Sequence, residues 1–145
     1  MRSARFFFGT NFKMFQTYGE SRDFVHEIRR ALGSPHNSQL FLIPPYTSLP
    51  GLPNLAHESG IWIGAQNMHD APMGEYTGEI SAPLLTALAV DLVLLGHAER
   101  RHKFGESDSL LRRKVVAGLA AGLRVLLCIG ETADEKAYHL EAETV

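Results

Sequence analysis

The sequence predicts an α/β protein built around a parallel β-sheet. Short apolar runs of four to six residues alternate along the chain with longer stretches in which apolar residues recur at helical spacing. This alternation is typical of repeated strand and helix units in a parallel sheet. The composition, 45% apolar and 21% charged over 145 residues, is that of one ordinary globular core. Because no linker or low-complexity tract interrupts the chain, we expect residues 1–145 to form a single domain.

Five short runs are the predicted strands, because each is rich in Phe, Ile, Leu or Val. They are Arg5–Phe8, Gln39–Ile43, Ile61–Ala65, Leu92–Leu95 and Arg124–Ile129. A segment long enough to hold a helix separates each run from the next, which favours parallel rather than hairpin pairing.

The first two segments between strands contain helix signals. A helix is predicted to begin at Ser21, a residue type favoured at helix amino termini, and to end at Gly33. Its apolar positions recur at helical spacing: Phe24, Val25, Ile28 and Leu32. In the second segment, four prolines between residues 44 and 53 leave room only for a short helix over Leu52–Glu58.

The third segment opens with a long loop, Gln66–Glu79, and continues into a predicted helix over Leu84–Ala89. Ser81 is the predicted cap of this helix, and Pro83 suits its first turn. A loop of this length in a compact domain usually carries function or an interface.

The fourth segment predicts a helix that begins at Ser107 or Asp108 and ends at Gly122. The residues expected to face inward are Leu110, Leu111, Val115 and Leu119. After Gly130 the chain turns polar, and one more helix is expected to begin there.

The bulk composition excludes several classes of function. Lysines and arginines total 14 against 16 aspartates and glutamates, so the net charge of −2 offers no overall field to attract nucleic acid or an anionic membrane. The one cysteine, Cys128, excludes an internal disulfide and is interpreted as a buried structural thiol. No stretch approaches the roughly 18 apolar residues of a membrane span, and residues 1–8 do not form a signal segment, so we expect a cytoplasmic protein.

Polar residues suited to chemistry follow the predicted strands, where parallel sheets with helical crossovers place their active sites. Asn11 and Lys13 come just after the first strand, and an amide and an ammonium there can contact a phosphate or a developing oxyanion. The alternative interpretation of Lys13 is a solvated surface lysine.

Two further strand ends carry candidate residues. His97 follows the fourth strand at once, and a helix that begins beside it would disfavour the protonated ring and leave a neutral donor. A histidine packed at the rim of the sheet is the alternative. Glu131 follows the fifth strand, either as an acid or base or as a structural carboxylate.

Five motifs together resemble the triosephosphate isomerase family in order and spacing. They are Asn11 with Lys13, Ala65–Asn67, Tyr76–Ser81, Gly96–Arg101 with Phe104–Glu106, and Cys128–Thr132. The resemblance implies a (β/α)8 TIM barrel, incomplete here with about five strands. It also implies an enzyme, usually a homodimer, that interconverts dihydroxyacetone phosphate and glyceraldehyde 3-phosphate without cofactor or metal, and without nucleic acid or membrane as a partner.

By matched position, the resemblance implies roles for individual residues. Lys13 would pair with the substrate phosphate and the enediolate oxygen, and Asn11 would support that oxyanion. His97 would be the neutral electrophile that polarises the carbonyl, a role for which this family is the standard example. Four more residues would support the loop, the subunit interface and the site, with the first reaching into the neighbouring subunit: Thr77, Glu79, Glu99 and Glu106.

The sequence departs from the family pattern in three places. Phe12 replaces the usual tryptophan, Ala98 replaces the usual serine after the histidine, and Asp134–Tyr138 replaces a run that ends in arginine and glycine. These changes favour a divergent branch, and an isomerase of another sugar phosphate, such as an erythrulose phosphate, is the alternative function.

Length is the largest departure, because a barrel of eight strands needs roughly 250 residues. We expect the chain to be truncated after the fifth strand, without the family's glutamate base, its lid loop and its glycine-rich phosphate sites. Neither Glu99 nor Glu131 matches that base by motif, so the chain alone is expected to be inactive. A non-catalytic half-barrel that binds a partner through its open edges is the third interpretation.

Overall fold

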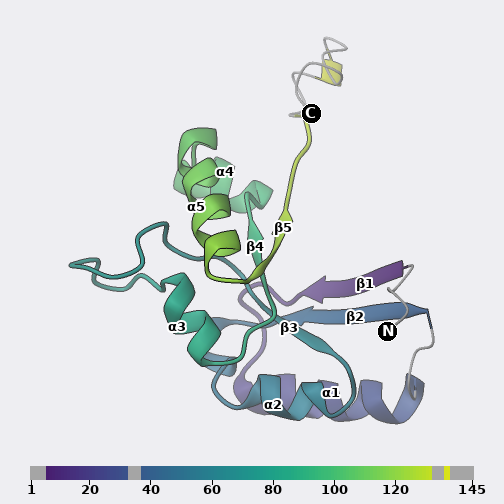
Figure 1. The fold of residues 1–145 in the computed structure, drawn as a ribbon. Helices are drawn as coiled ribbons and strands as arrows, with labels where there is room; N and C mark the ends of the chain where they lie inside the picture. The colour runs from purple at the N-terminus through teal and green to yellow at the C-terminus, as the bar shows by residue number, and fades with distance from the viewer. Residues whose placement is uncertain (1–5, 33–36, 132–135, 138–145) are drawn as a thin grey trace.

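The computed structural model describes residues 6–32, 37–131 and 136–137, and these contain one parallel sheet (Figure 1). Its strands follow the chain order, and each pairs in parallel with the next. They are β1 Phe6–Asn11, β2 Ser38–Ile43, β3 Trp62–Ala65, β4 Leu92–Leu95 and β5 Arg124–Leu127. The sheet curls into a half-barrel, which confirms the predicted α/β class and the partial TIM barrel.

The helices and one 3-10 turn connect the strands on the outer side of the curl (Figure 1). They are α1 Tyr18–Leu32, η1 Tyr46–Ser48, α2 Leu52–His57, α3 Ala82–Ala87, α4 Ala98–Phe104 and α5 Asp108–Ala120. In the part of the chain that the structure describes, no helix is long and apolar enough to cross a membrane.

The strand predictions hold with small shifts at the ends. The fourth strand has the predicted bounds, while β1 continues past Phe8 to Asn11. The last strand ends at Leu127, two residues before the predicted Ile129. Arg5, the predicted first residue of β1, lies outside the described residues.

The predicted cap of α1 was wrong. The helix begins at Tyr18, and Ser21 lies inside it, buried, with its amide donating to the carbonyl of Thr17. Thr17 is the capping residue: its Oγ1 accepts from the Glu20 amide at 3.4 Å, and Glu20 Oε2 accepts from the Thr17 amide at 2.8 Å. This reciprocal pair is a capping box, which satisfies two amides that a helix start leaves free. Gly33, the predicted end, lies outside the described residues.

The cap predicted for α5 was right, but part of its inward face was wrong. Ser107 caps the helix, with Oγ accepting from the Leu110 amide at 3.3 Å. Leu119, predicted inward, is 58% exposed, whereas Lys114 and Gly118 are buried. A Cβ on Gly118 would lie 3.3 Å from the Val125 side chain, so a small residue here lets the helix pack closely on β5.

The third helix also begins earlier than predicted. It spans Ala82–Ala87 instead of Leu84–Ala89, with Ser81 at the capping position and Pro83 in the first turn as expected. Ala89 has a φ of 59°, in the left-handed region, so it belongs to the turn that follows the helix.

The two faces of the sheet carry separate apolar clusters. The larger cluster lies between the sheet and the helices and contains Val25, Leu52, Ile63, Val93 and Leu111. The smaller one joins alternate residues on the concave face: Phe41, Ile43, Trp62, Leu92, Leu94 and Cys128. Cys128 is half-buried rather than buried, and its partial burial raises the pKa of the thiol against an opposing effect of the Arg101 charge.

Candidate active site

All the parallel strands have their carboxyl ends on the same side of the sheet, and the predicted site residues follow these strand ends. Asn11 is the last residue of β1, and its Oδ1 accepts from the Lys13 amide at 2.9 Å. This local turn holds Lys13 at a φ of 52°, a left-handed conformation that a non-glycine residue adopts only where its surroundings favour it. Because the amide oxygen of Asn11 is used in this turn, its nitrogen is the atom available to a ligand.

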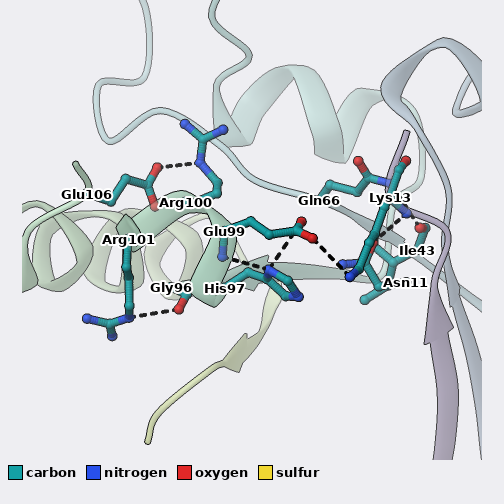
Figure 2. Close-up of polar contacts among 10 residues, drawn as sticks. All are labelled: Asn11, Lys13, Ile43, Gln66, Gly96, His97, Glu99, Arg100, Arg101 and Glu106. Atoms are coloured by element: carbon teal, nitrogen blue, oxygen red, sulfur yellow. Dashed lines mark hydrogen bonds and ion pairs between the residues drawn. The ribbon is translucent and has the colours of Figure 1, made fainter. Parts of the chain in front are cut away.

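Gln66, which follows β3, fixes Lys13 from the other side. Its Nε2 donates to the Lys13 carbonyl at 2.7 Å and to the Ile43 carbonyl at 3.2 Å (Figure 2). The ends of β1, β2 and β3 are therefore joined by a single side chain. The backbone of Lys13 is held between Asn11 and Gln66, while its ammonium reaches Glu99 across the strand ends.

His97 occupies the position where β4 passes into α4. Gly96 has a φ of 72°, a left-handed turn that glycine adopts without strain, and His97 is the capping residue of the helix. The Nδ1 atom of His97 accepts from the Glu99 amide at 3.2 Å. A backbone N–H can only donate, so this contact favours the tautomer in which Nδ1 is the acceptor and Nε2 carries the hydrogen.

Glu99 joins the two candidate catalytic groups. Its Oε1 lies 2.9 Å from Lys13 Nζ, and its Oε2 lies 3.5 Å from His97 Nδ1 (Figure 2). The ion pair with Lys13 is the shorter of the two contacts and is the one that holds the carboxylate. The hydrogen bond from Lys13 lowers the pKa of Glu99, with a smaller opposing effect of burial.

Behind these strand ends lies a network of buried ions that the sequence predicted only in part. Glu106 Oε1 accepts from Arg100 Nε at 2.6 Å and from Lys114 Nζ at 2.5 Å. Lys114 Nζ also donates to Asn67 Oδ1 at 3.0 Å. Sequence reasoning named Glu106 but missed Lys114, although Lys114 shares the helical stripe of Leu111 and Gly118.

The structure does not bring the other predicted residues to His97 and Lys13. Thr77 and Glu79 lie in the exposed loop between β3 and α3, which projects away from the sheet (Figure 1). The base of this loop is closed by the His69 amide, which donates to the Ile80 carbonyl at 2.8 Å. Glu131 lines a cavity of about 790 Å³ beside β5 and α5, and this cavity is also lined by Gly96 and Ala98, the chain neighbours of His97.

The strand ends carry one cation, on Lys13, and two groups with N–H donors, on His97 and Asn11. Lys13 supplies the charge, His97 offers Nε2, and Asn11 offers its amide nitrogen. Such preorganised donors stabilise an oxygen that gains negative charge, as when a carbonyl becomes an enediolate. In the described ranges, no group of three His, Cys, Asp or Glu residues is placed to hold a metal ion.

The family model of triosephosphate isomerase matches residues 6–145. The triosephosphate isomerase of Gluconacetobacter diazotrophicus is 47% identical over 128 residues, which are 88% of this chain and 52% of the relative. The triosephosphate isomerase of Aquifex aeolicus is 39% identical over 126 residues, 87% of this chain and 51% of the relative.

A third relative has a different name. The L-erythrulose-1-phosphate isomerase of Brucella abortus is 40% identical over 134 residues, 92% of this chain and 52% of the relative. The chain thus spans about half the length of the curated relatives that it matches. Because the family model covers nearly all of the sequence, the chain belongs to the triosephosphate isomerase family.

Proposed function

We propose that this chain provides the electrophilic half of an aldose–ketose isomerase site that interconverts dihydroxyacetone phosphate and glyceraldehyde 3-phosphate. The observation that carries the proposal is the pair of contacts made by Glu99: its amide donates to His97 Nδ1, and its carboxylate pairs with the ammonium of Lys13. Family membership and the names of the relatives support the same reaction.

The reaction moves a proton between two carbons through an enediolate. A base removes a proton from the carbon next to the carbonyl, and the carbonyl oxygen gains the negative charge. His97 Nε2–H then donates a hydrogen bond to that oxygen, and Lys13 and Asn11 stabilise the charge. Lys13 also offsets the charge of the substrate phosphate.

Glu99 is a poor candidate for the base. Its carboxylate is paired with Lys13 at 2.9 Å, and this hydrogen bond lowers its pKa, which weakens it as a proton acceptor. We assign Glu99 instead to holding the Lys13 ammonium beside His97. The base would then be supplied by the part of the relatives that this chain does not match.

We also propose that the active form is a homodimer, in which Thr77 and Glu79 contact the neighbouring subunit. Exposed apolar side chains follow the same strand ends as the site, which supports an interface there. Met14 is 94% exposed and Phe15 is 83% exposed after β1, and Met73 is 82% exposed in the loop after β3. The cytoplasm is the proposed location.

A four-carbon substrate is the second candidate, and it rests on two observations. The Brucella relative acts on L-erythrulose 1-phosphate by its name. Ala98, which directly follows His97, stands where the family resemblance places a serine. A smaller side chain beside the electrophile is compatible with a longer substrate.

The decisive experiment joins residues 1–145 to the part of the Gluconacetobacter relative that this chain does not match. The fusion and its His97→Gln variant are assayed with both triose phosphates and with L-erythrulose 1-phosphate. Turnover of trioses that the variant loses supports the first proposal, and preferred turnover of the tetrose supports the second. A fusion that is folded and inactive on both substrates would sink the proposed function.

A further inference from the structure

Lys114 is a buried cation on an outer helix, and nothing in the proposed reaction uses it. Lys114 is only 3% exposed, although it lies on α5, one of the helices that cover the outer side of the sheet. Burying a lysine costs several kcal/mol unless it is fully paired, and an apolar side chain of similar size would often be at least as stable there. A role other than stability is therefore indicated for this ammonium.

Lys114 is linked to Lys13 by one chain of contacts, the first arm, which runs through Asn67 and Gln66. The ammonium donates to Asn67 Oδ1 at 3.0 Å, and the phenol of Tyr46 donates to the Asn67 carbonyl at 2.5 Å. Asn67 is thus fixed through both its side chain and its backbone. Its chain neighbour is Gln66, whose side chain turns to the site and holds the Lys13 carbonyl at 2.7 Å.

Lys114 is linked to His97 by a second chain of contacts, the second arm, which runs through Glu106 and Arg100. The ammonium donates to Glu106 Oε1, and the same oxygen accepts from Arg100 Nε at 2.6 Å. The Arg100 carbonyl accepts from the Glu106 amide at 3.2 Å, so this pair is joined through backbone and side chain. The Arg100 amide in turn donates to the His97 carbonyl at 2.8 Å, in the first turn of α4.

The Glu106 carboxylate depends on Lys114 for its orientation. Both of its donors bond Oε1, while Oε2 is one of two buried side-chain polar atoms without a hydrogen-bond partner among the described residues. Without Lys114, only the half-buried Arg100 would hold the carboxylate, and the carboxylate could rotate about that bond. Asn67 would lose its side-chain partner at the same time.

We propose that Lys114 is a positioning residue that sets the relative placement of Lys13 and His97. It acts by fixing Asn67 behind one group and Glu106 behind the other. The importance of this placement for catalysis rests on the proposed function. The effect of Lys114 on the positions of Lys13 and His97 does not, because it is a property of the folded chain.

The test is NMR of the whole chain, with Lys114→Met compared with wild type. Two signals report the two arms: the imidazole nitrogens of His97 and the side-chain amide of Gln66. The wild type should show one neutral tautomer with the proton on Nε2. Lys114→Met should lose that single-tautomer pattern and should shift the Gln66 amide signals.

Arg113→Met is the matched control, since it removes the same charge from the preceding residue of the same helix. Arg113 pairs with Asp70 at 2.7 Å, and within the described residues it forms no hydrogen bond or ion pair with Asn67 or Glu106. This variant should leave both reporters unchanged. A merely structural role for Lys114 would lower stability without changing the His97 tautomer in the molecules that remain folded.

If Lys114→Met does not fold, the double variant Lys114→Met with Glu106→Gln removes both charges and carries the same test. His97 and Gln66 signals that coincide with wild type in a folded variant would overturn the proposal. Because neither reporter requires turnover, an inactive fusion would overturn the isomerase function while leaving this coupling standing. A tautomer change in an active fusion would support both.

Discussion

Individual residues of the site are held mainly by backbone hydrogen bonds. The tautomer of His97 is set by one amide, that of Glu99, and the conformation of Lys13 is set by the amide oxygen of Asn11. Neither arrangement requires a ligand, so these groups are in place in the unliganded chain. Preorganisation of this kind avoids reorienting dipoles when charge develops.

Glu106 should make the stability of the chain sensitive to acid. Burial by itself raises the pKa of Glu106, but hydrogen bonds from Lys114 and Arg100 together outweigh it, and the net pKa lies below its usual range. A depressed folded-state pKa stabilises the protein above the unfolded pKa of about 4.3, and this contribution is lost as the pH falls through the folded pKa. We expect Glu106→Gln to cost about 3 kcal/mol near neutral pH and to flatten the acid side of the stability curve.

Urea unfolding at a series of pH values measures this effect. The matched control is Glu58→Gln, because Glu58 pairs with Arg29 at 3.1 Å on the surface, where ion pairs contribute little. If the free energy of unfolding falls as steeply at acid pH in Glu106→Gln as in wild type, another carboxylate is responsible for the acid sensitivity.

At the scale of elements, local signals predicted the strands well and the helix faces less well. The run Leu92–Leu95 is apolar at every position because β4 is buried on both faces, and its bounds were predicted correctly. The inward face of α5 could not be read from apolar residues alone. Gly118 lets the helix approach β5, and Lys114 is buried because Asn67 and Glu106, distant in sequence, supply its partners.

The same limit explains the cap of α1. Both Thr17 and Ser21 are residue types that cap helices, and each precedes the apolar stripe of the helix. The deciding signal was Glu20, which stands three residues after Thr17 and completes the capping box. Attention to that spacing would have placed the helix start correctly from sequence.

Removing the Thr17 hydroxyl should therefore destabilise the chain by about 1 kcal/mol, since one helix amide loses its partner. Ser21→Ala should cost less, because the two hydrogen bonds of that hydroxyl are long at 3.3 Å and alanine favours the helix interior. Thermal and urea unfolding of both variants decide between the two residues. A larger loss in Ser21→Ala than in Thr17→Ala would restore Ser21 as the more important hydroxyl.

At the scale of the whole molecule, apolar side chains are exposed on both edge strands of the curled sheet, β1 and β5. Phe7 on β1 is 58% exposed and Leu127 on β5 is 42% exposed, and each of these strands has one neighbour among the described strands. Such edges favour pairing with further strands. Association through the sheet edges is therefore distinct from the dimer proposed around the active-site loops, and variants can separate the two.

Phe15→Lys should weaken the proposed dimer. Phe15 is 83% exposed just after β1, at the same end of the sheet as His97, and a buried aromatic anchor commonly contributes more than 1 kcal/mol to an interface. Placing a charge there should weaken association by about tenfold or more. Sedimentation equilibrium over a range of concentrations measures the change directly.

Leu119→Lys is the matched control for this prediction. Leu119 is 58% exposed near the end of α5, and because this helix runs antiparallel to the strands, it lies toward the opposite end of the sheet from the site. It should leave association unchanged. If both variants associate as wild type does, the contact lies at the sheet edges rather than around the loops. If Leu119→Lys alone dissociates the assembly, the proposed interface is on the wrong end of the barrel, and Thr77 could not reach a neighbouring site.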